Sequence, residues 1–158
     1  MDRINESRYE LDAIDHKILE MLLENSRYSM REIAKKVFLS STAVAARIER
    51  LERNKIITGY HVSVNPVMMG YYVKAYIQIQ VDPCRKNEFY PYMEQHNHVL
   101  ECDCVTGEYT MLIKVIFRTT MELDQFINEI QNFGKTNTLI VFSTAVHHRE
   151  AFWMNEEE

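Results

Sequence analysis

The stretch that most constrains the fold lies between residues 29 and 53. Within it, Val44, Ile48 and Leu51 recur at i, i+4 and i+7, which is the spacing of one buried stripe along a helix. At about 100° per residue, the opposite side of the same helix is small, polar or cationic. That side carries Thr42, Ala45, Ala46, Glu49, Arg50 and Arg53. Such a surface can approach a narrow, anionic partner closely.

Capping signals divide this stretch into two short helices. Ser29 and Glu32 have the spacing of a capping box, which satisfies backbone N–H groups where the first helix begins. Ser40 or Ser41 can cap the second helix after a short corner. We therefore predict a helix-turn-helix at about residues 30–49, whose second helix would enter the major groove of double-stranded DNA. An ordinary helical hairpin with a solvated, charged face is the alternative.

The charge distribution favours a nucleic-acid partner. Residues 27–55 contain eight Lys and Arg and three Glu, a local charge of 8 − 3 = +5, in a chain whose formal net charge is −5. A basic island in an acidic chain is expected of a phosphate-binding surface. Residues 1–60 hold 11 Lys and Arg against 10 Asp and Glu, whereas residues 61–158 hold 7 against 13. The second part therefore predicts a partner other than nucleic acid.

The predicted DNA contacts come from the second helix and from the end of the first. Arg50 and Arg53 are the first choices, because Arg can bond guanine bidentately or pair with a phosphate. Arg47 lies nearer the apolar stripe, so we expect a phosphate contact or an ion pair within the domain rather than base readout. The full predicted set is Lys35, Lys36, Ser40, Ser41, Thr42, Ala45, Ala46, Arg47, Glu49, Arg50 and Arg53.

The rest of the chain predicts an α+β protein of two modules. An amphipathic helix from residue 11 to about residue 24 precedes the helix-turn-helix, and residues 56–64 favour a short β wing or connecting strand. Strictly alternating residues 71–81 begin a second module. We expect a helix at 86–96, strands at 99–106 and 109–117 around a tight turn, a helix capped by Thr120, and a strand at 138–148. We predict domains at 1–60 and 72–148, with a hinge at 61–71 and an acidic tail at 149–158.

The order of elements in the second module is β-α-β-β-α-β, that of the ferredoxin-like fold. Its sheet would carry helices on one face only. The other face, with Tyr72 and Tyr76, needs cover, and a second copy of the chain is the simplest cover. We therefore predict a homodimer formed mainly through this module.

Several functional classes receive little support. No apolar run approaches the roughly 18 residues of a membrane span, and no apolar signal-peptide core follows the N-terminus, so we expect a cytoplasmic protein with no membrane partner. The pair His96 and His98, followed by Cys102 and Cys104, could suit zinc or copper. Alternation places both cysteines on the core side of a strand, however, and we predict no metal and no cofactor. Motifs of phosphate loops, nucleophile elbows and metalloproteases are missing, and we predict no enzyme.

Both modules together resemble the Lrp/AsnC family of transcriptional regulators. The segments that carry the resemblance are LDAIDHKIL (11–19), RYS (27–29), IAKKV-x-LS (33–40), AVAARIERLE (43–52), I-x-GY (57–60), NP…G (65–70) and VTGEY (105–109). The resemblance implies a winged helix-turn-helix joined to a ligand-sensing ferredoxin-like domain, and dimers that often assemble into octamers. It also implies a small effector, usually an amino acid, bound between dimers near Gly107, Glu108, Tyr109 and Thr110.

Three residues depart from the family pattern. Phe38 stands where members usually have the glycine of the helix-turn-helix corner. If that position needs a positive φ, a phenylalanine there costs on the order of 1 kcal/mol. The alternative is that the corner is wound differently. Lys55 replaces another usual glycine, where Asn54 could supply the left-handed cap. Thr110 stands where many members have an aspartate that would pair with an amino acid's ammonium group. Glu108 is the only nearby carboxylate that could substitute.

The sequence therefore predicts a sequence-specific DNA-binding transcriptional regulator, dimeric or octameric and located with the nucleoid. A small ligand would modulate its assembly or its DNA affinity. Two alternatives keep the fold. One is an architectural protein that wraps DNA with little sequence preference and needs no ligand. The other is a regulator that responds to a metal or to thiol oxidation.

Overall fold

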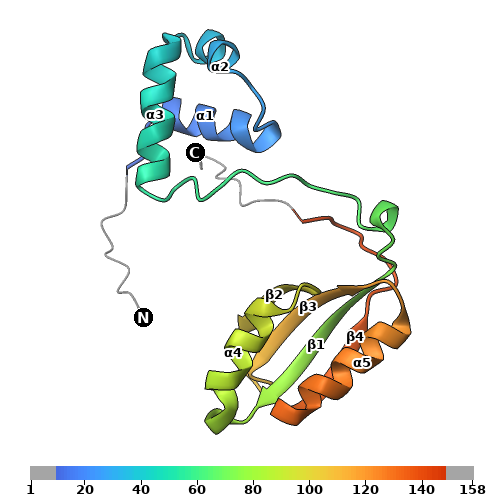
Figure 1. The fold of residues 1–158 in the computed structure, drawn as a ribbon. Coiled ribbons are helices and arrows are strands. Elements are labelled where there is room, and N and C mark those ends of the chain that lie inside the picture. Colours follow the sequence, from blue (N-terminus) through green and yellow to red (C-terminus); the bar gives the residue numbers. More distant parts are fainter. Residues whose placement is uncertain (1–9, 149–158) are drawn as a thin grey trace. The chain divides into compact units, whose positions relative to one another are not determined.

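The computed structural model describes residues 10–148, which divide into two compact units, the first reaching to Val62 and the second spanning Ser63–His147 (Figure 1). Residues 1–9 and the predicted acidic tail at 149–158 lie outside the described residues. None of the helices in the described part is long and apolar enough to cross a membrane.

The first unit consists of three helices that bury one shared core. They are α1 (Ala13–Glu24), α2 (Met30–Val37) and α3 (Ser41–Arg53). The apolar stripe of α3 is buried as its spacing predicts, because Val44, Ile48 and Leu51 all lie in this core. Burying such a side chain contributes roughly 1.5–3 kcal/mol relative to leaving it exposed. The stripe therefore fixes which side of α3 faces outward.

Side-chain caps set where α2 and α3 begin. The predicted capping box forms: the Glu32 backbone N–H donates to Ser29 Oγ at 3.3 Å, and the Ser29 N–H donates to Glu32 Oε2 at 2.8 Å. Ser40, rather than Ser41, caps α3 by accepting from the Ala43 N–H at 3.1 Å. These bonds satisfy N–H groups that have no partner within a helix.

Both residues that replace a usual glycine adopt the left-handed conformation. Phe38 has φ 55° and ψ 41°, so the helix-turn-helix corner is wound as a glycine would wind it, with a phenylalanine in its place. The prediction that Asn54 would supply the second left-handed position was wrong, because Asn54 has φ −86° and Lys55 has φ 59°. The left-handed turn at Lys55 lets the Ile56 N–H reach the Leu51 carbonyl at 3.0 Å, and the Lys55 N–H bonds the Glu52 carbonyl at 3.0 Å, as in a Schellman helix end.

The predicted β wing does not form among the described residues. Residues 54–72 contain one turn of 3-10 helix, η1 (Val67–Met69), and no strand. A strand needs a neighbour to pair its backbone groups, and no strand of the described chain pairs with this segment. Val62 and Val64 accordingly remain 87% and 57% exposed. The segment is an extended connection, and η1 ends at Gly70 with φ 85°.

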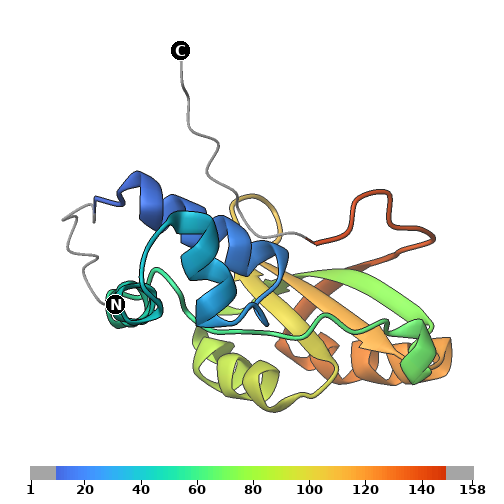
Figure 2. The same cartoon turned by 90° about the horizontal axis from the view of Figure 1, so that it is seen from above.

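The second unit is a four-stranded antiparallel sheet. Its α-helices lie on one face of the sheet, as Figures 1 and 2 show. Its elements are β1 (Val73–Val81), α4 (Lys86–Gln95), β2 (Val99–Cys104), β3 (Met111–Phe117), α5 (Thr120–Ile130) and β4 (Gly134–Ile140). The strand order β2-β3-β1-β4 is that of the predicted ferredoxin-like fold. Ala75, Ile77 and Ile79 of β1 are fully buried in a core shared with both helices.

Several boundaries of the second unit differ from the predicted ones. The predicted tight turn is a longer connection, residues 105–110, closed by a 2.9 Å bond from the Val105 N–H to the Thr110 carbonyl. Thr119, not Thr120, caps α5. The last strand begins at Gly134 and ends at Ile140, earlier than predicted, because its register places Gly134 opposite Val81.

Candidate nucleic-acid interface

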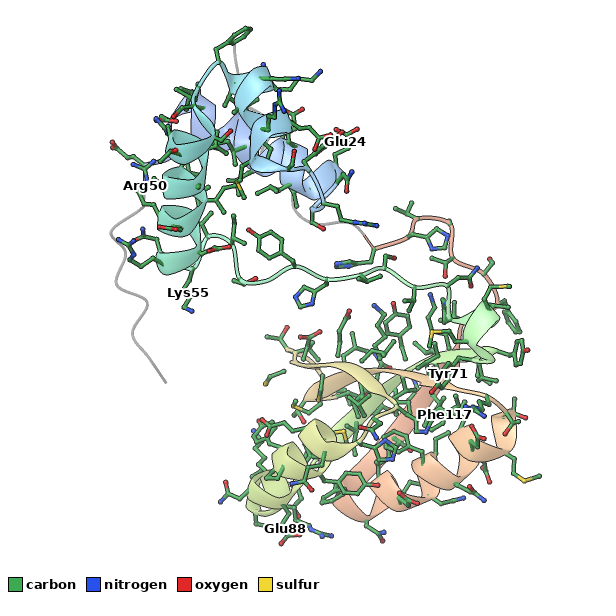
Figure 3. All side chains as sticks on the ribbon, turned by 45° about the horizontal axis from the view of Figure 1, so that its top comes forward. Glu24, Arg50, Lys55, Tyr71, Glu88 and Phe117 are labelled. Carbon is green, nitrogen blue, oxygen red and sulfur yellow. The ribbon has the colours of Figure 1, made fainter. Side chains whose placement is uncertain are left out.

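The outward side of α3 has the predicted composition and is accessible. The exposed members of the predicted set are Ser40, Ser41, Thr42, Ala46, Glu49, Arg50 and Arg53 on or before α3, and Lys35 and Lys36 on the last turn of α2. Ala45 and Arg47 are partly buried. Figure 3 shows Arg50 on α3 and Lys55 just past the end of this helix. The structure thus brings the predicted residues together on two consecutive helices.

Two arginines of this surface are held by carboxylates of α1. Arg47 Nη1 lies 2.6 Å from Asp12 Oδ2 and 2.7 Å from Asp15 Oδ1, and Arg50 Nη2 lies 2.7 Å from Asp15 Oδ2. The predicted ion pair of Arg47 within the domain is confirmed. The ion pair between Arg50 and Asp15 was not predicted, because Arg50 was expected mainly to contact DNA. The side chain of Arg50 nevertheless remains 44% exposed.

The geometry of the α1 terminus explains why both carboxylates lie there. Asp12 is the N-cap of α1 and accepts from the N–H groups of Ile14 and Asp15 at 2.9 and 2.8 Å. Asp15 completes the capping box and is fully buried. Loss of hydration raises the pKa of the Asp12 carboxyl. The hydrogen bonds from the Asp15 N–H and the Arg47 guanidinium lower this pKa by more, so it lies below its ordinary value. The sequence signal that could have found this cluster is the spacing of Asp12 and Asp15. They are three residues apart, as in a capping box, at the start of a helix that packs against α3.

The four residues of the predicted effector site lie in the connection between β2 and β3. Gly107 has φ 120°, and Glu108 Oε1 lies 3.2 Å from Lys135 Nζ of β4. Thr110 joins β3 to β1: its N–H donates to the Ile79 carbonyl and its Oγ1 accepts from the Val81 N–H, both at 3.1 Å. The Thr110 hydroxyl thus takes part in the sheet.

Two family models match consecutive parts of the chain. The AsnC-type helix-turn-helix domain matches residues 11–52, and the Lrp/AsnC ligand binding domain matches residues 74–151. The chain belongs to the Lrp/AsnC family of DNA-binding transcriptional regulators.

Individual members of the family agree with this result over nearly their whole length. The HTH-type transcriptional regulator LrpA of Bacillus subtilis is 33% identical over 132 residues, 83% of this chain and 97% of that protein. The structure of AsnC from E. coli has a TM-score of 0.82 at 31% identity, covering 90% of this chain and 99% of its own. A feast or famine regulatory protein from M. tuberculosis, complexed with L-methionine, has a TM-score of 0.84 at 26% identity and the same coverage.

In this Lrp/AsnC protein there is a cavity of about 540 Å³ that the predicted effector residues do not line. It is lined by Arg85, Tyr92, Glu129, Asn132 and Phe133, which come from α4, α5 and the turns beside them. Its polar groups bond mainly to one another: the Arg85 guanidinium donates to the Asn132 carbonyl, and the Tyr92 hydroxyl donates to Glu129. None of these five residues was predicted to belong to a site.

The predicted cysteine pair of β2 is only partly buried. Cys102 packs against the core as predicted, and burial raises the pKa of its thiol to about 11. The prediction that Cys104 also faces the core was wrong: it is exposed because β2 ends at this residue. Within residues 10–148, no three His, Cys, Asp or Glu side chains are grouped to hold a metal ion.

Proposed function

We propose that α3 is the helix that this regulator inserts into the major groove, and that the predicted contact residues of α2 and α3 touch the DNA. The observation that carries the proposal is the two-sided character of α3. Its apolar stripe is fixed against α1 and α2, while its small, polar and cationic side is accessible. Arg53 would contact a base or a phosphate, and Lys35 and Lys36 the sugar–phosphate backbone. Because its partner is DNA, we place the protein in the cytoplasm, with the nucleoid.

The test compares two variants that each lose one positive charge of the first unit. Arg53→Ala removes a cation of the proposed interface, and Lys17→Ala removes an exposed cation of α1. Binding is measured by fluorescence anisotropy on a duplex selected from a random library. Arg53→Ala should weaken binding about tenfold and reduce the salt slope by about one, while Lys17→Ala should stay within about twofold of the parent. Equal losses in the two variants would refute the proposal.

The same assay separates a sequence-specific regulator from an architectural protein. The ratio of affinities for the selected duplex and for its scrambled sequence is measured at fixed salt. A specific regulator should show a ratio of about 10³ or more, whereas a ratio near one favours DNA wrapping with little sequence preference.

We further infer that the uncovered face of the sheet forms a homodimer, which assembles into an octamer. Tyr76 lies near its centre, opposite Lys114 of β3 and Leu139 of β4. Leu139 is 50% exposed and Tyr72 69% exposed, so apolar surface is available there. Leu139→Lys should lower the mass measured by light scattering towards the 18.8 kDa of one chain. Met121→Lys, an equally polar change at a 72% exposed site on α5, should leave the mass unchanged.

We also propose that the second unit binds a small ligand, with an amino acid as the first candidate. The methionine complex of the M. tuberculosis relative supports this class of ligand. At Gly107, Glu108, Tyr109 and Thr110, the Glu108 carboxylate is paired with Lys135, so an α-ammonium group must compete with that lysine. A thermal-shift screen of amino acids and metal ions tests the proposal, because ligand at 100 times its Kd stabilises the folded state by about 2.7 kcal/mol. If the ligand binds at this turn, Lys135→Ala should enlarge the shift and Glu108→Gln should abolish it.

A further inference from the structure

The carboxylate of Asp15 lies beneath the proposed recognition helix with 1% of its side chain exposed. Its two oxygens bond two different arginines of α3: Oδ1 bonds Arg47 and Oδ2 bonds Arg50. Oδ2 also accepts from the Asp12 N–H at 3.4 Å. We propose that Asp15 is a positioning residue that sets how selectively this protein binds DNA, because it fixes the guanidinium group of Arg50. This inference rests on the proposed role of α3.

Burial makes the Asp15–Arg50 pair hard to separate. A carboxylate taken out of water loses its favourable hydration, and only close, hydrogen-bonded partners offset this loss. If Arg50 swung away to follow a phosphate, Asp15 would lose one of its two cationic partners. The guanidinium of Arg50 is therefore held on one side by Asp15, while 44% of the side chain stays accessible.

A fixed arginine favours base recognition over backbone binding. A guanine edge requires two parallel hydrogen bonds in one geometry, and a side chain already held near that geometry loses less conformational entropy when it binds. Phosphates make no such demand, since any mobile cation can pair with them. A fixed Arg50 therefore contributes more to the selected sequence than to DNA in general.

Charge balance acts in the same direction. Arg47 and Arg50 supply two positive charges, and Asp12 and Asp15 supply two negative ones, so this cluster has a net charge of 2 − 2 = 0. General attraction to phosphate depends on the number of cations that replace condensed counterions. The cluster adds little to that attraction, and Asp15 thereby suppresses binding to unrelated sequences.

The experiment uses two substitutions that each remove one negative charge from the cluster. Asp15→Asn removes the negative charge that pairs with Arg50, and it also removes the charge behind one of the two contacts of Arg47. Asp12→Asn is the matched control. Asn caps a helix about as well as Asp, and of the two arginines Asp12 pairs with Arg47 and not with Arg50. The affinity of the full chain for a selected duplex and for its scrambled sequence is measured from about 50 to about 200 mM salt.

Both variants should bind the scrambled duplex more tightly, with a salt slope steeper by up to about one. Only Asp15→Asn should also lose selectivity, with the ratio of the two affinities falling about tenfold, which is within the discrimination of one bidentate contact. Equal ratios in the two variants would overturn the inference. A general effect of charge would change both variants alike, and simple unfolding would weaken binding to both duplexes.

A second substitution keeps the inference testable if Asp15→Asn does not fold. Arg50→Lys preserves the charge but lacks the planar fork, and it lies at a partly exposed site. It should leave affinity for the scrambled duplex within about twofold while the ratio falls about tenfold. An unchanged ratio would refute the role given to Arg50 and thus to Asp15. If Arg53→Ala weakens binding but these variants keep the parental ratio, only this inference fails and the proposed function stands.

Discussion

The corner of the helix-turn-helix contains a residue whose replacement by glycine should stabilise the fold. Phe38 has φ 55° and ψ 41°, where a side chain other than glycine costs roughly 1–2 kcal/mol. The ring recovers little of this cost, because Phe38 is 91% exposed. Glycine adds flexibility to the unfolded chain, which opposes the gain by roughly 0.5–1 kcal/mol. Phe38→Gly should therefore stabilise the first unit by about 0.5–1 kcal/mol.

Hydrogen exchange at backbone amides of α2 and α3 measures this effect within the unit itself. Because a factor of ten corresponds to about 1.4 kcal/mol, exchange of the slowest amides should slow about two- to fivefold. Phe38→Ala is the control that removes the ring but keeps the left-handed strain, and it should leave exchange nearly unchanged. Lys55→Gly relieves the same strain at a second site with φ 59° and should slow exchange to a similar degree.

Two results would refute this reasoning. If Phe38→Ala slowed exchange as much as Phe38→Gly, the ring and not the backbone would be the source of the cost. If Phe38→Gly accelerated exchange, the exposed ring would have to contribute stabilising contacts larger than the left-handed strain.

Three further predictions concern other parts of the chain. A Cβ atom at position 134 would lie 1.9 Å from the Gln80 carbonyl oxygen, so Gly134→Ala should lower the free energy of unfolding of the second unit by about 3 kcal/mol, as measured by urea unfolding. A loss below about 1 kcal/mol would contradict the close approach of β1 and β4. Because burial raises the pKa of Cys102 to about 11, iodoacetamide near neutral pH should label Cys104 and spare Cys102, as peptide mass spectrometry would show. The folded-state pKa of Asp12 is lowered from 3.8, so its carboxylate should stabilise the protein above pH about 4, and this contribution should be lost as the pH falls through the lowered value. The parent protein should therefore be more stable than Asp12→Asn near neutral pH, and the difference should shrink in acid. A difference that does not depend on pH would contradict the ion pair.

Local signals in the sequence were sufficient for most of the fold. The stripe of α3 and the alternation of β1 follow from periodicity, and Ser29 and Ser40 cap helices because a hydroxyl before a helix can bond its N–H groups. The usual glycine marked position 38 as a candidate for the left-handed conformation, but the sequence left open whether Phe38 would adopt it or the corner would be wound differently. In each case the residues that determine the structure lie within about one turn of helix or one strand.

Features that depend on partners distant in the chain were missed. The start of β4 is set by its register against β1, where Gly134 must pass close to Gln80, and no local pattern reports that approach. Residues 56–64 have the composition of a strand, but the described chain provides no neighbouring strand to pair with them. Pairing, not propensity, decides whether such a segment becomes a strand.

The ion pairs of Asp15 show how a local motif acquires a tertiary role. Its arginine partners lie 32 and 35 residues away, so their contact depends on how α1 packs against α3. The segment LDAIDHKIL, one of those that carry the family resemblance, contains both carboxylates that hold α3. It also contains Ile14, Ile18 and Leu19, which pack in the core of the first unit. Substituting Asp15 therefore perturbs the surface of α3 without changing any residue on it. If Asp15→Asn alters selectivity, the first helix contributes to DNA recognition without contacting the DNA.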